Sequence, residues 1–336
     1  MIAVHILISI LPVVLFLSGL VLVDSYKLVR FRSVGAALTA GLMAAGAAWF
    51  VNNGLVDVLD VDRVMFSRYV APLTEESLKA FWILFVVFSD RVGFSVDAAI
   101  IGFSVGAGFT VLENIYFLGA LDAGTQTWVI RGFGTAIMHG VTATVFAVML
   151  RTLAHSSARS RLVGTTSAFV LAVILHSGYN HFPFTPMVST AVLVITSPMV
   201  LMGLFQQSER QTRTWLGTGF DTDQELMTLL MSGDFGASRI GQYLSSLREH
   251  FEGPIVADML CLIRIRVELS IRAKGLLMMQ EAGFTPPPDA SVQAKFKELE
   301  YLEDSIGKAG MLAIDPIQRW SSKELWQLNM LSERKG

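Results

Sequence analysis

The sequence predicts an all-α protein, a polytopic helical membrane bundle of about seven spans followed by a helical cytoplasmic domain. Two observations lead to this prediction. Hydrophobic residues make up 52% of the 336 residues, whereas charged residues make up 16%. The charges are also unevenly distributed, with 11 Lys and Arg and 10 Asp and Glu up to Gln206, against 15 and 18 from Gln207 onward. Residues 1–206 therefore have the composition of a membrane bundle, and residues 207–336 that of a soluble domain.

The membrane part contains hydrophobic stretches that are each close to the roughly 20 residues a helix needs to cross a hydrocarbon layer of about 30 Å. The first stretch lacks the basic n-region and the small-residue cleavage site of a signal peptide, so we expect it to be a true span. The expected spans are 2–23, 34–52, 66–88, 95–119, 127–150, 163–181 and 187–206.

Basic residues in the loops predict the orientation of these spans. Lys and Arg concentrate after spans one, three, five and seven, whereas the alternate loops are mainly acidic. By the positive-inside rule, the N-terminus lies outside and the C-terminal domain lies in the cytoplasm. The basic residues are Lys27, Arg30, Arg32, Arg91, Arg151, Arg159, Arg161, Arg210 and Arg213, the acidic ones are Asp57, Asp60, Asp62 and Asp122, and the exceptions are Arg63, Arg68 and Arg131.

The domain at residues 207–336 is expected to be helical, because apolar residues recur in it at helical spacing. Its net charge is close to zero, so nothing in it indicates nucleic-acid binding. The single cysteine, Cys261, excludes an internal disulfide and is expected to be a buried, small apolar residue. Regulation, partner binding and dimerisation all remain open as roles. The expected helices are 225–232, 237–251, 254–282, 290–314 and 315–332.

Ionisable residues interrupt four neighbouring spans of the membrane part. A charge near the middle of a bilayer costs at least about 2.5–3.5 kcal/mol, so such residues rarely persist without a function. Span three carries Glu75 and Glu76 about ten residues, or roughly 15 Å, from its outer end. Spans four, five and six carry Glu113, His139 and His176. These groups are expected at comparable depth, which predicts one site that activates water.

Three further polar residues are expected to support this site. Lys79 follows Glu75 by four residues, which is the spacing of a pair along one helix face. We expect one glutamate of span three to pair with Lys79 and the other to remain free to take a proton from water, and the sequence does not select between them. Asn114 in span four, and Asn180 one helical turn after His176, are the other supporting groups, Asn180 by orienting the imidazole.

A rival motif for hydrolysis occurs in span four. Residues 102–106 read Gly-Phe-Ser-Val-Gly, which matches the G-x-S-x-G string of serine hydrolases. That motif works as a strained turn between a strand and a helix. Here it lies inside a continuous apolar helix, where the two glycines also form a small face for helix packing. We therefore expect Ser104 to be a packing residue and not a nucleophile.

The polar residues also form an ordered set of motifs. Residues 75–79 have the form EExxK, residues 109–114 the form FxxxEN, and residues 176–180 the form HxxxN. In this order, over roughly residues 60–185, they resemble the PrsW family of intramembrane proteases. That family is related to the CAAX-processing membrane endopeptidases, which carry a histidine in place of the FxxxE glutamate.

The resemblance implies a function for the membrane part. It implies proteolysis of membrane-anchored proteins, with the paired glutamates and the motif histidine of the family carried over onto Glu75, Glu76 and His176. In the best-known PrsW case the substrate is a single-span anti-sigma factor, so a protein of that kind is the expected partner beside the lipid bilayer. The resemblance leaves the C-terminal 130 residues without a role.

Two schemes of water activation fit these residues. In the first, which needs no cofactor, a glutamate of span three is the general base, and His176 with Asn180 stabilises the oxyanion. In the second, Glu113, His139 and His176 hold a zinc ion, and a glutamate of span three deprotonates its water. The sequence lacks the HExxH helix that would favour zinc strongly, so the choice stays open.

Two other classes of function remain as alternatives to an intramembrane protease. One is a non-catalytic membrane receptor or scaffold, in which buried charges hold the bundle together and the cytoplasmic domain signals. The other is an ion- or proton-coupled transporter, because Glu and His inside a membrane also serve as relays. A protease requires these groups to converge around one cavity, whereas a transporter requires them along a path between the two faces.

Overall fold

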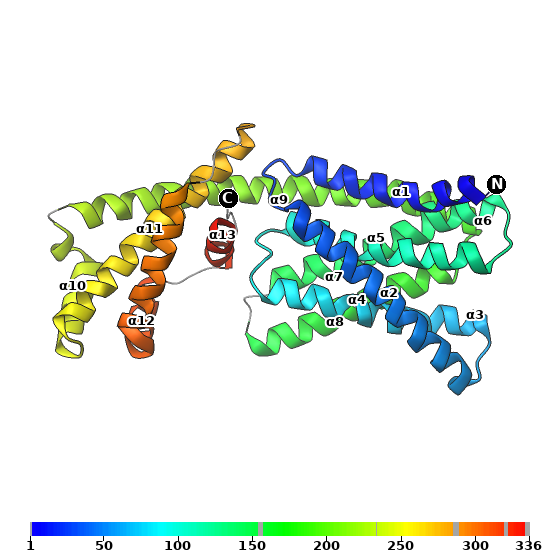
Figure 1. Ribbon diagram of the computed structural model, residues 1–336, viewed down its shortest axis with the longest axis horizontal. Coiled ribbons are helices and arrows are strands. Elements are labelled where there is room, and N and C mark those ends of the chain that lie inside the picture. The colour runs from blue at the N-terminus through cyan, green and yellow to red at the C-terminus, as the bar shows by residue number, and fades with distance from the viewer. Residues whose placement is uncertain (1, 154–156, 233, 285–288, 319–321, 333–336) are drawn as a thin grey trace. The chain divides into compact units, whose positions relative to one another are not determined.

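The computed structural model describes residues 2–153, 157–232, 234–284, 289–318 and 322–332, and over these ranges the chain is built from helices and short loops (Figure 1). The chain divides into two compact units, Met1–Glu209 and Arg210–Gly336. Unit 1 comprises α1 (Ile2–Val23), α2 (Phe31–Leu59), α3 (Arg63–Met65), the π-helical η1 (Phe66–Val70), α4 (Ala71–Phe88), α5 (Ser95–Ala120), α6 (Thr125–Val129), the π-helical η2 (Ile130–Thr135), α7 (Ala136–Leu153), α8 (Ala158–Asn180) and the first part of α9 (Pro186–Met231).

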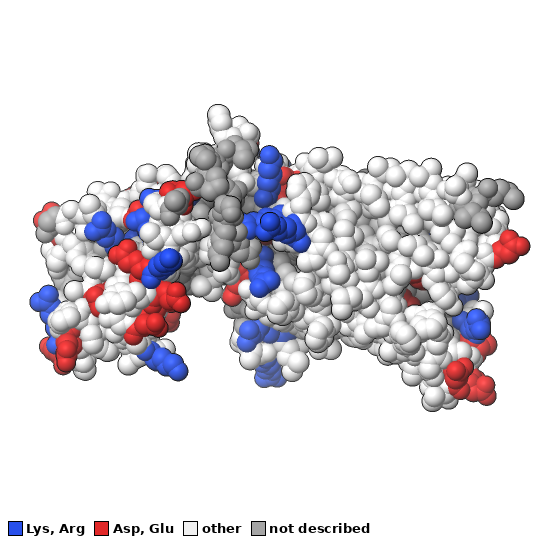
Figure 2. Space-filling view, viewed as in Figure 1, with Lys and Arg blue, Asp and Glu red and all other residues white. Residues whose placement is uncertain are grey.

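Among the described residues, six helices or helix runs are long and apolar enough to cross a membrane, judged by length and composition. They are α1, α2, α5, the run Thr125–Leu153, α8 and α9. The remaining predicted span, 66–88, corresponds to η1 and α4, the helix that carries Glu75, Glu76 and Lys79. The predicted all-α membrane bundle is therefore confirmed. On the face shown in Figure 2, much of the surface of unit 1 is free of charged side chains, which gather near the ends of its helices.

Helix α5 occupies the centre of unit 1, where it packs against α1, α2, α4 and α7. Glycines make the closest of these contacts possible. A Cβ atom at Gly41 of α2 would lie 2.0 Å from the carbonyl oxygen of Val105, and one at Gly106 of α5 would lie 2.2 Å from the carbonyl oxygen of His139. Because no side chain fits there, α5 lies against the backbones of both α2 and α7. This close approach fixes the depth of His139 in the bundle.

The G-x-S-x-G string lies within the same helix and serves packing, as expected. Ser104 is fully buried, and its hydroxyl donates to the carbonyl oxygen of Ile100 at 2.7 Å. The backbone around it is regular α-helix rather than a turn between a strand and a helix. The geometry of a serine hydrolase is therefore missing at this position.

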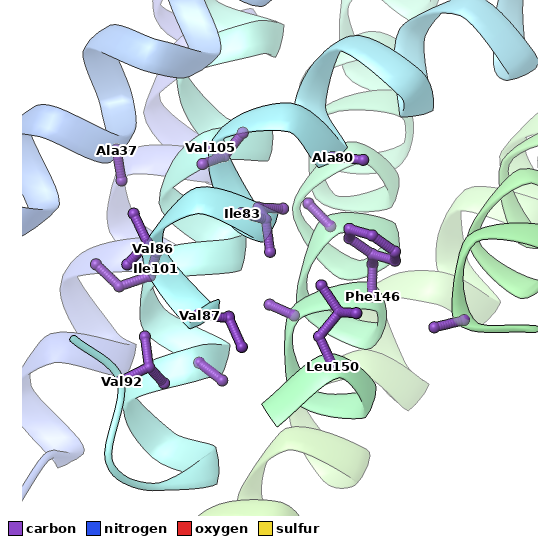
Figure 3. Packing of buried hydrophobic residues seen from close by; sticks show 14 of the residues in the cluster. Ala37, Ala80, Ile83, Val86, Val87, Val92, Ile101, Val105, Phe146 and Leu150 are labelled. Atoms are coloured by element: carbon purple, nitrogen blue, oxygen red, sulfur yellow. The ribbon is translucent and has the colours of Figure 1, made fainter. Parts of the chain in front are cut away.

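An apolar cluster joins α4, α5 and α7 next to the ionisable residues (Figure 3). Ala80 and Ile83 follow Lys79 along α4 and are almost completely buried. They pack with Ile101 of α5 and Phe146 of α7 in one core. Since protein interiors are close-packed, this core holds the three helices at fixed separations. The polar side chains one turn earlier in α4 are thereby held by rigidly packed neighbours.

Two helices enter the bundle through π-helical segments that the sequence did not indicate. η1 leads into α4 and η2 leads into α7. Within η1, the carbonyl oxygen of Ser67 accepts from Asn180 Nδ2 at 2.8 Å, and that of Arg68 accepts from Ser177 Oγ at 2.6 Å. These bonds fasten the end of α8 to the start of α4. Short π segments of this kind occur frequently at functional sites.

Unit 2 is a separate helical domain with its own core around α11. Its elements are the last part of α9 (210–231), η3 (Phe235–Ala237), α10 (Arg239–Ser246), η4 (Leu247–Glu249), α11 (Gly253–Glu281), α12 (Ala290–Gln318) and α13 (Ser322–Ser332). The predicted helix 254–282 matches α11 closely. The predicted division after Ile314 is wrong, because α12 continues through Pro316 and is instead interrupted at Gly307, whose φ is 67°. The expectation of a buried Cys261 is also wrong, since this residue lies on an exposed face of α11.

Candidate active site

A cavity of about 850 Å³ lies within unit 1, lined by α2, η1, α4, α5, η2, α7 and α8. Four of the five predicted catalytic residues line it, and so does Asn180. The fifth, Glu76, lies outside the lining, and so do Lys79 and Asn114. The lining site residues are Glu75, Glu113, His139, His176 and Asn180.

Glu76 is held behind the cavity wall by three donors on a single oxygen. Its Oε1 accepts from Lys79 Nζ at 2.6 Å, from His176 Nδ1 at 2.8 Å and from Thr142 Oγ1 at 3.1 Å. The ion pair therefore joins Lys79 to Glu76, three residues away, rather than to Glu75 at the spacing noted in the sequence. Both partners are almost fully buried, which disfavours an isolated charge, so each charge is tolerated there because the other compensates it. Glu76 is thus a fixed carboxylate.

The bond to Glu76 settles which nitrogen of His176 faces the cavity. A carboxylate only accepts, so Nδ1 carries the proton that it donates to Glu76, and in the neutral ring Nε2 then carries a lone pair. Nε2 lies 3.8 Å from Oε2 of Glu75. This separation exceeds a hydrogen bond. The two atoms therefore face a common point instead of bonding to each other.

Lys79 settles the tautomer of His139 in the same way. An ammonium group has no lone pair, so His139 Nδ1 accepts from Lys79 Nζ at 3.0 Å. The proton of the neutral ring is then on Nε2, which lies 3.3 Å from Oε2 of Glu113. The rings of His139 and His176 meet edge to face, with their centroids 4.8 Å apart. Lys79 thus orients both the fixed glutamate and the second imidazole.

Glu113 has a cationic partner that sequence reasoning missed. Arg131 Nη2 lies 3.3 Å from Glu113 Oε1, and Arg131 Nε donates to Asn114 Oδ1 at 2.9 Å. Asn114 in turn donates to the carbonyl oxygen of Ser9 at 2.8 Å, which ties α1 to the site. The signal was present in the sequence, because Arg131 is an arginine inside a predicted apolar span.

Glu75 is the one carboxylate of the three without a cation bonded to it among the described residues. Its Oε1 accepts from Asn52 Nδ2 at 3.2 Å, and its Oε2 faces His176. Asn180, expected to orient the imidazole, lines the cavity and donates to η1 instead. The orienting bond to His176 comes from Glu76. Glu75 therefore combines cavity access with an uncompensated charge.

A family model for the PrsW family of intramembrane metalloproteases matches residues 30–204, more than half of the chain. The chain belongs to this family. The predicted resemblance is confirmed, and the match includes every predicted catalytic residue. Together with the apolar helices, membership of the PrsW family makes the chain an integral, multi-pass membrane protein and an intramembrane protease. Neither the curated proteins nor the solved structures searched include a match to it.

The residues of this PrsW-family site fit a metal ion. Glu75, His139 and His176 each offer a ligand atom, and these atoms lie within 4.8 Å of one another. Two imidazoles and one carboxylate are a ligand set that zinc takes in hydrolases. The set differs from the predicted one in a single member, because Glu113 pairs with Arg131 while Glu75 has no such partner. Oε2 of Glu113 is buried without an aligned hydrogen-bond donor, so the same pocket retains a further oxygen.

Proposed function

We propose that this chain hydrolyses a peptide bond of a membrane-anchored protein and that Glu75 engages the attacking water. The observation that carries the proposal is the 3.8 Å separation of Glu75 Oε2 and His176 Nε2 across the cavity. A water molecule between two acceptors of this kind is oriented by both and can lose its proton to the carboxylate. Glu76, which is fixed in its ion pair, holds His176 in the tautomer that this arrangement requires.

The remaining site residues receive supporting roles in this proposal. Asn180 lines the cavity and uses one amide N–H for Ser67, so its second N–H is a donor for the oxyanion that forms at the substrate carbonyl. His139 and Glu113, with Arg131 behind them, form another part of the cavity wall. Glu75, once it has taken the proton from water, is the acid that returns it to the leaving amine.

The charges of the site favour a bound cation in addition. Among the described residues, the three carboxyl groups of Glu75, Glu76 and Glu113 lie with two cations, Lys79 and Arg131, so one carboxyl group has no cationic partner. A zinc ion held by Glu75, His139 and His176 would polarise the substrate carbonyl and make a bound water more acidic. His139 would bind the ion through Nε2 as a neutral imidazole, so its ring proton would lie on Nδ1 and the pair of Lys79 and His139 would together release one proton. Glu75 then serves as a ligand, and its replacement is damaging in either scheme.

The partner class follows from the family resemblance and the orientation of the spans. We propose a single-span membrane protein of the anti-sigma-factor type as substrate, with the N-terminus of the protease outside and residues 207–336 in the cytoplasm. Supporting this, the site lies in the half of the spans that the loop charges assign to the outer side of the membrane.

The test is co-expression with a tagged library of single-span proteins, followed by detection of cleaved products. Glu75→Gln preserves size and hydrogen bonding but removes the base, so cleavage should fall by a factor on the order of 10²–10⁴. His176→Ala should be comparably damaging. Ser104→Ala is the matched control, because it changes a buried polar residue of the same unit outside the cavity. Cleavage that survives Glu75→Gln and disappears with Ser104→Ala would refute the proposal.

A further inference from the structure

We propose that Asn52 of α2 is a positioning residue for Glu75. This inference rests on the proposed role of Glu75 as the residue that engages water. Asn52 Nδ2 donates to Glu75 Oε1 at 3.2 Å. Both side chains line the cavity, and they come from different helices, α2 and α4. The contact is made by a residue outside the EExxK, FxxxEN and HxxxN motifs.

A second hydrogen bond fixes which end of the Asn52 amide faces Glu75. Thr74 Oγ1 donates to Asn52 Oδ1 at 2.5 Å, and Thr74 directly precedes Glu75 in α4. An inverted amide would place its oxygen against the carboxylate, so that two acceptors face each other, and would reverse the direction of the bond with Thr74. The network therefore assigns the N–H end to Glu75. Thr74 and Glu75 of α4 therefore bind the two ends of the Asn52 amide of α2.

The amide bond determines what the second oxygen of Glu75 does. With Oε1 occupied by Asn52, Oε2 is the oxygen that faces His176. Because the amide is neutral, it orients the carboxyl group without compensating a charge on it. Lys79, by contrast, compensates the charge of Glu76. A glutamate side chain that has lost this contact regains rotamer freedom, and effective catalysis depends on near-attack geometry. Asn52 thus orients Glu75 without placing a cation against it.

The kinetic test uses the full chain in detergent and a fluorogenic reporter made from a single-span protein that the co-expression library shows to be cleaved. Asn52→Leu should lower kcat by about 10- to 100-fold, because the base is no longer held, and should leave KM within about twofold. Asn52→Asp should be more damaging still, since it places a carboxylate against Glu75. Asn52→Gln, which keeps the amide, should restore part of the loss.

The matched control is Thr39→Leu, on the same helix α2. Thr39 is exposed, does not line the cavity, and its hydroxyl donates only to the carbonyl oxygen of Gly35 in its own helix among the described contacts, so its replacement should leave kcat within about twofold. Introduced into Glu75→Gln, Asn52→Leu should have no further effect, because the group it positions is already disabled. An equal loss in both backgrounds would overturn the inference and leave the role of Glu75 intact. Full activity of Glu75→Gln would instead refute the proposed function itself.

A spectroscopic measurement tests the contact without substrate. The carboxyl or carboxylate infrared band that disappears in Glu75→Gln belongs to Glu75. This band should shift in Asn52→Leu, because one oxygen of Glu75 loses its hydrogen-bond donor there, and it should stay in place in Thr39→Leu. An unchanged band in Asn52→Leu would show that the amide does not bind Glu75, whatever the variant does to folding.

Discussion

At the scale of single residues, the two adjacent glutamates of α4 differ because consecutive helical positions are rotated by about 100°. Glu76 turns toward Thr142 of α7 and His176 of α8, which bind it together with Lys79 of its own helix. Glu75 turns toward α2 and the cavity. The sequence showed that one of the two would pair with Lys79 but not which, because the spacings of three and four residues are both compatible with a helix. The choice is made by the neighbouring helices.

The buried pair of Lys79 and Glu76 gives a prediction about stability. Lys79→Met leaves the Glu76 carboxylate buried without its cation, which should destabilise the chain by about 3–5 kcal/mol. The double variant Lys79→Met/Glu76→Gln removes both charges and should be less destabilised than Lys79→Met alone. Unfolding by titration with SDS in mixed micelles measures both. Equal stability of Lys79→Met and the wild type would show that the ion pair between Lys79 and Glu76 does not form in the protein.

The dependence of cleavage on a metal ion is also a question about single residues, because three side chains would supply the ligand atoms. We expect a chelator to lower cleavage and added zinc to restore it, because Glu75, His139 and His176 present a zinc ligand set with an uncompensated charge. His139→Ala should lower the zinc content of the purified chain. Cleavage that is unaffected by chelation, in a chain free of zinc, would assign the base role to Glu75 alone.

At the scale of elements, the loop after α1 contains a carboxyl group with a shifted titration. Asp24 follows the last residue of α1 and accepts from the backbone N–H of Val29 at 3.1 Å. Burial raises the pKa of Asp24 from 3.8 to about 6, against the opposing effect of its backbone hydrogen bonds. The folded state therefore binds this proton more tightly than the unfolded state does.

The sign of the resulting pH dependence follows from this shift. The contribution of Asp24 to stability is fully present below about pH 4 and is lost as the pH rises through about 6, an effect of at most about 3 kcal/mol. Asp24→Asn cannot ionise, so its melting temperature in detergent should vary less between pH 4.5 and 7 than that of the wild type. At pH 7 the variant should be the more stable of the two. A steeper pH dependence in Asp24→Asn would contradict the assignment.

Helix contacts through glycine give a prediction for α5. Gly106→Ala places a Cβ against the backbone of His139, so α5 and α7 must separate, and both thermal stability and cleavage should fall. Gly46→Ala is the control, because its Cβ would meet Leu112 at 3.8 Å, an ordinary contact. That variant should melt at least as high as the wild type, since alanine also favours a helix. Similar melting temperatures for the two variants would show that the close contact is not maintained.

Much of the fold and part of the site could be predicted from the sequence, for a physical reason. Apolar stretches and the ionisable residues within them are visible in one dimension, so the spans and Glu75, Glu113, His139 and His176 were found. Asn52 and Thr142 were not, because a neutral polar residue in a helix acquires a role only when another helix packs against it. The π-helical segments were also missed, since they change local hydrogen bonding without changing composition.

At the scale of the whole molecule, the convergence of four helices on one cavity bears on the alternative functions. A transporter requires its ionisable groups along a path between the two faces. In this chain, Glu75, Glu113, His139 and His176 surround one cavity, and the family match independently indicates a protease. A receptor or scaffold has no need of such a cavity. The observations therefore favour hydrolysis over both alternatives.

The proposed orientation is tested on the same scale. Reporter fusions at residue 336 should be active on the cytoplasmic side, and fusions in the loop around Asp122 on the outer side, because basic residues concentrate in the loops after spans one, three, five and seven. A fusion after residue 27 serves as a second cytoplasmic point. A reporter at residue 336 that works only outside would reverse the proposed topology and with it the side from which substrate reaches the site.

The π-helical segments have a consequence for comparing this chain with its relatives. A π turn closes through a bond from residue i to i+5, so it holds one residue more than an α turn. A relative that lacks one residue within η1 (Phe66–Val70) can close an ordinary α turn there and still point its EExxK glutamates as this chain does. A deletion of one residue between η1 and Glu75 would instead swing both carboxylates by about 100°. Gaps in an alignment are therefore harmless in one segment and disabling a few positions later.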